Sequence, residues 1–217
     1  MNVKNTTTKD KVIDKTKPFT RRGTERRLNL LKTAYQLFLQ HGYDKVSLDE
    51  IIQIAGGSKT SIYQYFDDKK GLFHAVCDYH FSQKSQNFIL EYQEDDTLKS
   101  YLHKTLSKFY HTIQQERDRQ FFHLILQQSQ SDPSLMHDLN QRWCNEVQGN
   151  VKNILTQAHQ QQKILCPNPT YSATMFWGIV HDIHWKSLMN LPLDPEQVEA
   201  YLAYSLEHFL IAHQYQP

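Results

Sequence analysis

The sequence lacks the features that mark secreted, disulfide-stabilised and membrane-spanning proteins. No apolar run approaches the ~20 residues that a transmembrane helix needs, and the polar, Lys-rich N-terminus has no apolar segment like that of a signal peptide. The cysteines Cys77, Cys144 and Cys166 form an odd, scattered set, which is typical of reduced thiols rather than of a disulfide framework. We therefore expect a cytoplasmic protein with no membrane partner.

Motifs of common catalytic and cofactor sites are also missing. The chain contains no Gly-x-Ser-x-Gly, no glycine-rich phosphate loop, no His-Glu-x-x-His and no Cys-x-x-Cys. His181 and His184 lie on one face of an expected helix, but no third clustered ligand accompanies them. We expect no catalytic residues, no cofactor and no metal. A satisfied polar cluster, a ligand-orienting role and a pH-sensitive role for these two histidines all stay open.

Glycine is scarce, at seven residues, and no strand-like alternation of apolar and polar residues is sustained. Apolar residues recur instead at the spacing of one helix face, which predicts an all-α fold of about nine helices. The expected helices are one over 24–40, two short ones that follow Ser47 and Ser58, one from about Lys69, and five near 97–115, 119–130, 134–161, 170–189 and 195–213.

Charge is nearly balanced overall, at +1, but it is unevenly distributed along the chain. Residues 1–70 contain 14 Lys and Arg against 8 Asp and Glu, a net charge of +6, whereas residues 71–217 contain 10 against 15, a net charge of −5. A basic head on an acidic body favours contact between the head and a polyanion, although chance alone gives such asymmetry too.

Two short helices joined by a glycine-containing turn indicate a helix-turn-helix. Ser47 is placed to cap the first, with Glu50 completing a capping box, and Gly56-Gly57 ends it. Ser58 caps the second helix, and the free backbone N–H groups at the N-terminus of that helix suit a phosphate. A B-DNA major groove is about 12 Å wide and admits one α-helix of this kind.

The second short helix has an anchoring face and a polar face. Ile62 and Phe66 lie four residues apart and are expected to anchor the helix on its support. The side chains left to face the groove are Lys59, Thr60, Ser61, Tyr63, Gln64 and Tyr65.

The stretch from Arg27 to Leu72 resembles the DNA-binding head of the TetR family of transcriptional regulators. The residues that carry the resemblance are Ala34, Leu37-Phe38, Gly42-Tyr43, Ser47, Ile51, Ala55-Gly56, Ser58, Ile62-Tyr63, Tyr65-Phe66, Lys69 and Leu72. The resemblance implies base-edge contacts from Thr60 and Gln64, contacts to the DNA backbone or a thymine methyl from Tyr63 and Tyr65, and phosphate contacts from Ser47, Ser58 and Lys69.

The chain departs from the family pattern at two positions. Ile52 stands where the family usually has Ala, and Gly57 stands where it usually has Val. Our hypothesis is that Ile52 fills the volume left by the missing side chain at Gly57, which would conserve packing volume.

Three segments are expected: a flexible basic arm over 1–22, a helix-turn-helix domain over 23–70 and a helical ligand-binding and dimerisation domain over 71–217. The arm either follows DNA phosphates or enters the minor groove, or it is a disordered solubilising tail. The resemblance implies a homodimer through residues 170–213, and the alternative is that the apolar stripes of these residues form a core within one subunit.

The body is rich in aromatic residues, which suit a pocket for an unknown small apolar or aromatic ligand. The candidate ligand-binding residues are Phe109, Phe122, Trp143, Phe176, Trp177 and His181, although for any single one of them a simple packing role is the favoured interpretation. The leading hypothesis is a ligand-responsive repressor that binds a palindromic double-stranded DNA operator as a dimer. The alternatives are a DNA-bound adaptor that recruits a protein partner without a small ligand, and an enzyme with an appended DNA-binding head.

Overall fold

The computed structural model describes residues 20–216, which contain eleven α-helices, one π-helical segment and no strand. The predicted all-α class is confirmed. The helices of the N-terminal half are α1 (Arg21–His41), α2 (Leu48–Ala55), α3 (Lys59–Phe66), α4 (Lys69–Phe88) and α5 (Leu98–Ile113). Those that follow are α6 (Glu116–Ser129), α7 (Pro133–Arg142), the π-helical segment η1 (Trp143–Gln148), α8 (Gly149–Gln160), α9 (Pro169–Gly178), α10 (His181–Leu188) and α11 (Pro195–Ala212).

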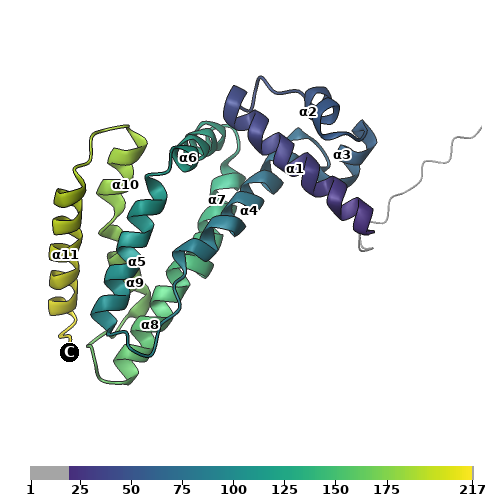
Figure 1. Ribbon diagram of the computed structural model, residues 1–217. Coiled ribbons are helices and arrows are strands. Elements are labelled where there is room, and N and C mark those ends of the chain that lie inside the picture. The colour runs from purple at the N-terminus through teal and green to yellow at the C-terminus, as the bar shows by residue number, and fades with distance from the viewer. Residues whose placement is uncertain (1–19, 217) are drawn as a thin grey trace, which may run out of the picture.

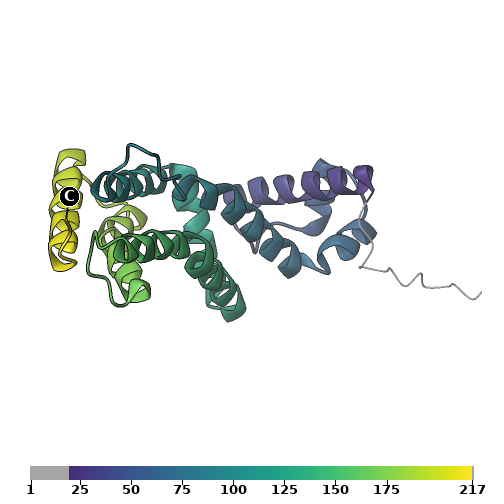
Figure 2. The ribbon, with the colours of Figure 1, turned by 90° about the horizontal axis from the view of Figure 1, so that it is seen from below.

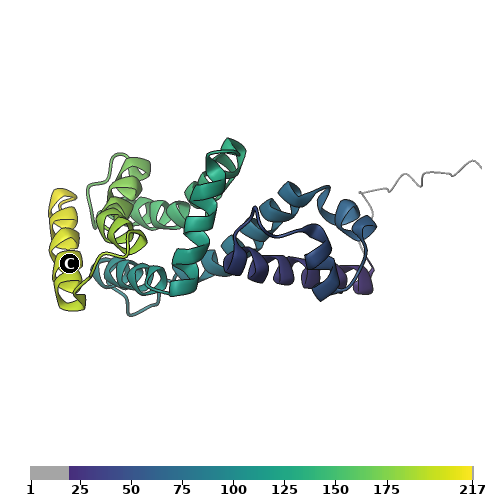
Figure 3. The ribbon, with the colours of Figure 1, turned by 90° about the horizontal axis from the view of Figure 1, so that it is seen from above.

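The molecule is elongated, with a small head at one end and a larger helical body at the other (Figure 1). Helices α1, α2 and α3 form the head, and α4 runs from the head into the body. Helix α11 lies at the end farthest from the head in all three views (Figures 1, 2 and 3).

Side-chain caps define where the head helices begin. The Ser47 hydroxyl accepts a hydrogen bond from the Glu50 backbone N–H at 3.1 Å, which confirms the predicted cap of α2. Thr20 caps α1 through the Gly23 N–H, so α1 begins at Arg21, three residues earlier than predicted. The end of the predicted arm is therefore helical, and residues 1–19 of the arm lie outside the described residues.

Two hydrophobic cores hold the chain together. The head core combines α1, α2 and α3 with the first turns of α4, and it also takes in Phe121 and Ile125 of α6 and Leu135 of α7. The second core lies in the body, among α5, α8, α9, α10 and α11. Because α6 and α7 belong to the body by sequence but pack into the head core, the packing crosses the predicted segment boundary at residues 70 and 71.

Two of the predicted long helices are interrupted. The helix predicted at 134–161 contains the π-helical segment η1 between α7 and α8, with no loop between them. The helix predicted at 170–189 is divided into α9 and α10, because Ile179 N–H bonds Phe176 O and Val180 N–H bonds Trp177 O, three residues back instead of four. Nowhere in residues 20–216 is there a helix with the length and apolarity to cross a bilayer.

Candidate nucleic-acid interface and body cavity

Helix α3 rests on the head core through its predicted anchors. Ile62 is fully buried and Phe66 is 4% exposed, and both belong to the head core. Arg27 of α1 places its guanidinium 5.2 Å from the centre of the Phe66 ring. The anchors are thus confirmed, and they hold α3 as a short rod on the support of α1, α2 and α4.

The N-terminus of α3 is closed by two serines. The Ser58 hydroxyl accepts the Ser61 backbone N–H at 3.2 Å, and the two hydroxyl oxygens also lie 3.2 Å apart. Ser61 is only 6% exposed. The prediction that Ser61 faces the groove is therefore wrong, because its side chain turns inward beside the Ser58 cap.

The other predicted groove residues lie toward solvent to different degrees. Lys59, Thr60 and Tyr63 are exposed, whereas Gln64 and Tyr65 are partly buried. Lys59 forms an ion pair with Asp49 of α2 at 3.0 Å, on an exposed surface where such a pair is weak. The exposed part of α3 therefore combines one cation with hydroxyl and amide groups, which are the groups that read base edges and phosphates.

Lys69 lies at the start of α4 and is turned toward the connection between α1 and α2. Its ammonium donates to the Asp44 carbonyl at 3.3 Å and lies 4.4 Å from the centre of the Tyr43 ring. Burial lowers the pKa of Lys69 below its ordinary value, against the opposing charge of Asp44. Lys69 thus packs against Tyr43 and Asp44, and the phosphate contact that the family resemblance implies for it stays a prediction.

Two arginines beside α3 were missed by the sequence reasoning. Arg26 lies against the turn, since a side chain added at Gly57 would come within 4.0 Å of the Arg26 Cδ, and Arg27 stacks on Phe66. The signal was present in the Arg-Arg pair at 26–27 within the first turns of α1. These residues extend the basic surface next to α3.

The turn between α2 and α3 needs its glycines for backbone reasons. Gly56 has φ +72° and Gly57 has φ +124°, which side chains rarely adopt. The nearest atoms to a Cβ added at Gly57 belong to Ser61 and Arg26, at 3.9 and 4.0 Å, and none belongs to Ile52. The hypothesis that Ile52 replaces the missing volume at Gly57 is therefore wrong.

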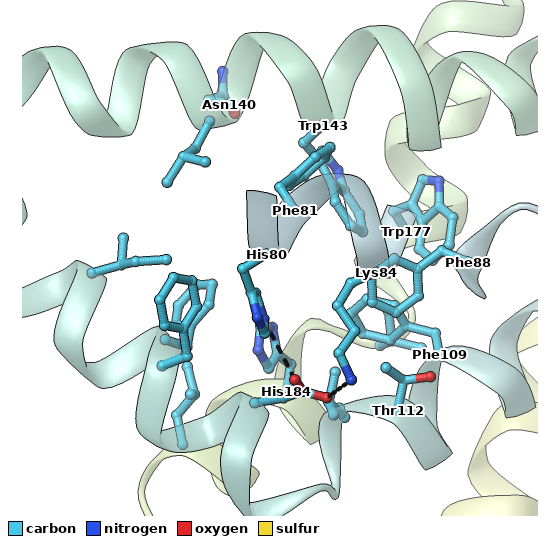
Figure 4. Close-up of a pocket in the computed structure, with 18 of the residues that line it drawn as sticks. His80, Phe81, Lys84, Phe88, Phe109, Thr112, Asn140, Trp143, Trp177 and His184 are labelled. Carbon is cyan, nitrogen blue, oxygen red and sulfur yellow. Dashed lines mark hydrogen bonds and ion pairs between the residues drawn. The ribbon is translucent and has the colours of Figure 1, made fainter. Parts of the chain in front are cut away.

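The body contains a cavity of about 660 Å³. Its walls come from α4, α5, α6, α7, η1, α9 and α10, and Phe109, Phe122, Trp143, Trp177 and His181 are among the lining residues. Aromatic rings of Phe81, Phe88, Phe109, Trp143 and Trp177 gather on one side (Figure 4). Phe176 does not line the cavity: it is fully buried and stacks edge-to-face on Phe209 of α11, so its predicted place in the pocket is wrong.

A polar corner interrupts the apolar wall. Lys84 donates to Asp118 Oδ2 at 2.8 Å, and His80 Nε2 lies 3.4 Å from Asp118 Oδ1 (Figure 4). Burial, together with the charges of Lys84 and Arg117, lowers the pKa of His80 to about 3. Burial, followed by the charge of His181, lowers the pKa of His184 to about 4. His184 is therefore neutral at pH 7 and does not titrate near neutrality.

The His181 and His184 pair has no third partner for a metal, since no group of three or more His, Cys, Asp or Glu suited to a metal ion occurs within residues 20–216. Of the two, His184 makes ring contacts with Phe109 and Phe122, at centroid distances of 5.7 and 5.0 Å. Both histidines line the cavity.

Comparison with known families accounts for most of the chain. The model of the bacterial regulatory proteins of the tetR family matches residues 30–76. The model of the C-terminal domain of AefR-like transcriptional repressors matches residues 100–215, which is more than half of the chain. The chain belongs to the TetR family.

Solved structures of TetR-family proteins share the fold. A putative TetR-family regulator from Mesorhizobium loti aligns with a TM-score of 0.75 and 20% identity, covering 89% of this chain and 98% of its own. The flavonoid-responsive regulator FrrA aligns with a TM-score of 0.76 and 22% identity, covering 87% of this chain and 97% of its own. At such low identity these structures establish the fold alone.

Curated relatives of this TetR-family chain match over shorter stretches. The repressor TetR of Mycobacteroides abscessus is 39% identical over 59 residues, which is 27% of this chain and 31% of the relative. The repressor ComR of Escherichia coli is 42% identical over 48 residues, which is 22% of this chain and 23% of the relative. The chain thus spans less than a third of these relatives' length.

The outer face of α9, α10 and α11 in this TetR-family body carries exposed apolar side chains. The apolar stripes within residues 170–213, from which the dimer was predicted, include Ile183, Leu202 and Leu206, and these three side chains are buried in the body core of one subunit. A different set is exposed: Tyr171, Met175, Trp185, Met189, Tyr201, Tyr204 and Ile211. The sequence reasoning named Met175 in the predicted interface but missed the rest of this second set, because it treated each helix as having a single apolar face.

Proposed function

We propose that this TetR-family protein is a transcription regulator that inserts α3 into the major groove of double-stranded DNA. The observation that carries the proposal is the build of α3, which is anchored by buried Ile62 and Phe66 and exposes Lys59, Thr60 and Tyr63. Gln64, although partly buried, has the amide that pairs bidentately with adenine. Arg26 and Arg27 supply nearby positive charge for phosphates.

The active form in this proposal is a homodimer joined through α9, α10 and α11. An exposed apolar set of this kind is typical of a protein interface, and it lies at the end of the molecule away from the head (Figure 1). One short helix reads only a few base pairs, so two heads on two half-sites are required for a specific operator.

Sedimentation analysis tests the dimer with two matched variants. Trp185→Glu places a charge on the outer face, where Trp185 is 55% exposed, and is expected to yield monomers. Ile54→Glu places the same charge on α2, where Ile54 is 62% exposed, and is expected to leave the dimer intact. A Trp185→Glu protein that stays dimeric at micromolar concentration contradicts this interface.

The proposed regulation is release from DNA when a small ligand fills the body cavity. Cys77 of α4 and Phe121 and Ile125 of α6 line the cavity and also belong to the head core. A ligand that displaces these side chains acts on the support of α3 through direct packing. The coupling free energy required is only about 1–3 kcal/mol.

A cavity of about 660 Å³ favours this regulation over the adaptor alternative, which calls for no ligand. We propose repression because a protein that occupies an operator blocks transcription sterically. It needs no further surface for contacts with other proteins. The relatives do not decide the sign, since they include the activator FasR of Mycolicibacterium smegmatis, 43% identical over 56 residues, or 26% of either chain.

Selection of bound sequences from a pool of random DNA duplexes tests the proposal. The unliganded full chain is expected to enrich a palindromic sequence, and its affinity for that sequence is expected to fall steeply as salt concentration rises. Failure to enrich any sequence above the starting pool contradicts the proposed function.

A further inference from the structure

We propose that the body cavity selects an uncharged, multi-ring aromatic ligand that carries a hydroxyl group, and that this hydroxyl donates to Asp118. The inference deepens the proposed ligand response and rests on it. The geometry that points to it is a buried acceptor on Asp118 and buried donors on Trp177 and Arg119, all without hydrogen-bond partners, on residues that line a cavity with a largely aromatic wall.

The unused acceptor is Asp118 Oδ1. The carboxylate side chain is 13% exposed, and its Oδ2 is occupied by Lys84 at 2.8 Å. Oδ1 is buried and accepts no hydrogen bond, although His80 Nε2 lies 3.4 Å away. An unsatisfied buried carboxylate oxygen is a strong acceptor for a hydroxyl group, because hydrogen bonds to an ionised partner are about twice as strong as neutral ones.

The unused donor is the indole N–H of Trp177. Trp177 is 4% exposed and lines the cavity, and its Nε1 has no hydrogen-bond partner. The indole N–H donates only, so it suits a carbonyl or ether oxygen of a ligand. The Arg119 Nε is likewise buried without a partner, while the Nη2 of the same side chain is held by Glu116.

The charges around the cavity compensate one another, which excludes a strongly charged ligand. Lys84 is paired with Asp118 and also donates to Gln115, and Arg119 is paired with Glu116. The lowered pKa of His80, to about 3, keeps that ring neutral at pH 7. An anion in the polar corner would face the Asp118 carboxylate, and a cation would face Lys84, so a neutral ligand fits best.

The aromatic wall sets the shape of the ligand. Phe109 makes edge-to-face contacts with Trp143 and Trp177, at centroid distances of 5.8 and 5.4 Å, and Phe88 lies 5.2 Å from Phe109. Rings that pack edge-to-face leave flat faces for a further aromatic ring. The cavity volume of about 660 Å³ lies within the range of sites for drug-sized molecules.

Calorimetric titration of the full chain with three probes of one shape tests the ligand class. The probes are 4-phenylphenol, biphenyl and 4-phenylbenzoate, which present a hydroxyl, a hydrogen and a carboxylate on the same two rings. Wild-type protein is expected to bind 4-phenylphenol at least about 10-fold more tightly than either of the others. Equal affinities, a preference for the benzoate, or no binding of 4-phenylphenol would each overturn the proposal.

The Asp118→Asn variant sharpens the test, because it removes the charged acceptor and leaves Lys84 uncompensated. The advantage of 4-phenylphenol is expected to shrink several-fold, and binding of 4-phenylbenzoate is expected to rise. Asp182→Asn, at an exposed carboxylate of α10 that pairs with Lys186, is the control and keeps the wild-type order. An unchanged order in a folded Asp118→Asn protein overturns the role of Asp118.

The Trp177→Phe variant gives an independent readout that keeps the aromatic ring and removes the N–H. Its affinity for 4-hydroxybenzophenone, which adds a carbonyl acceptor, is expected to be lower than that of the wild type. Its affinity for biphenyl is expected to equal that of the wild type. If the variants fail to fold, the order of affinities of the three probes for the wild-type protein is by itself the test of the proposal. Duplex binding by the unliganded protein is measured separately, so failure of the ligand class leaves the DNA-binding proposal standing.

Discussion

Single side chains on α3 decide which DNA sequence this protein prefers. Gln64→Ala is expected to reduce discrimination at one base position by about 1–3 kcal/mol, since it removes a bidentate contact to a base edge. Fluorescence anisotropy with the selected duplex and its single-base variants measures the change. Ser61→Ala is the matched control: Ser61 is buried beside Ser58, so base preference is expected to stay the same. A Ser61→Ala protein with altered base preference would contradict the orientation of α3.

The helix caps and the anchoring residues of the head were predictable from sequence. The orientation of the side chains that lie between a cap and an anchor was not. Ser47 and Ser58 act on amides three residues ahead, so their roles depend on local sequence alone. Ser61 is adjacent to the anchor Ile62, and whether it turns inward depends on how α3 sits against its neighbours. Tertiary packing of that kind leaves no local signal.

Gly71 is a second residue on which the head depends. A Cβ added there would lie 1.9 Å from the Phe66 backbone oxygen, so any side chain forces α3 and α4 apart. Gly71→Ala is expected to lower the free energy of unfolding by about 1–3 kcal/mol, as overpacking does elsewhere. Urea denaturation measures it, with Gly178→Ala as control.

No atom lies within 4 Å of a Cβ added at Gly178. Its replacement within α9 is therefore expected to be neutral or to stabilise by about 0.5–1 kcal/mol. Equal effects of Gly71→Ala and Gly178→Ala would contradict the close approach of α3 and α4.

At the scale of elements, α7 is tied to α4 by a junction cluster made of Lys70, His74, Asp132 and Ser134. Asp132 lies 3.1 Å from Lys70 Nζ and 2.5 Å from His74 Nε2, and it accepts the Ser134 hydroxyl. Burial raises the pKa of Asp132, but hydrogen bonds from Ser134, His74 and Lys70 outweigh it and hold the pKa well below its ordinary value. The cluster thus joins a body helix to the helix that supports α3.

Asp132→Asn is expected to lower the free energy of unfolding by about 1–3 kcal/mol, because it leaves Lys70 and His74 without a charged acceptor. Its contribution is present above the ordinary carboxyl pKa and is lost as pH falls through the lowered folded-state pKa. Denaturation at pH 7 measures the loss. Asp138→Asn, at an exposed site on α7, is the control, and the account fails if the two substitutions have the same effect.

Element boundaries were predictable where a local signal exists. Pro133, Pro169 and Pro195 each stand at the first position of a helix, as proline's fixed φ allows. The division between α9 and α10 has no such signal. Apart from Met175, the outer apolar set of α9, α10 and α11 was missed because these helices are apolar on two sides, and periodicity alone does not separate a core face from an exposed one.

At the scale of the whole molecule, buried neutral histidines couple stability to pH. The pKa values of His80 and His184 are lowered to about 3 and about 4 in the folded state. Below pH 6.5 the unfolded chain therefore binds protons that the folded chain does not, so stability falls as pH falls.

Between pH 7.5 and 5.5 the expected loss is about 1.4 kcal/mol for each of these histidines. Urea denaturation at the two pH values measures it, and the double variant His80→Gln, His184→Gln is expected to flatten the difference. His137→Gln, at an exposed histidine, serves as control and should leave the difference unchanged. Identical pH dependence in the double variant and wild type would contradict the burial of these rings.

The central claim is that two copies of this chain place their α3 helices in successive major grooves of one DNA duplex. Hydroxyl-radical footprinting on the selected duplex tests it most directly. The account predicts two protected patches related by the symmetry of the palindrome, on one face of the duplex and centred about 34 Å apart or a multiple of that distance. A single protected patch, or uniform protection along the duplex, would contradict it.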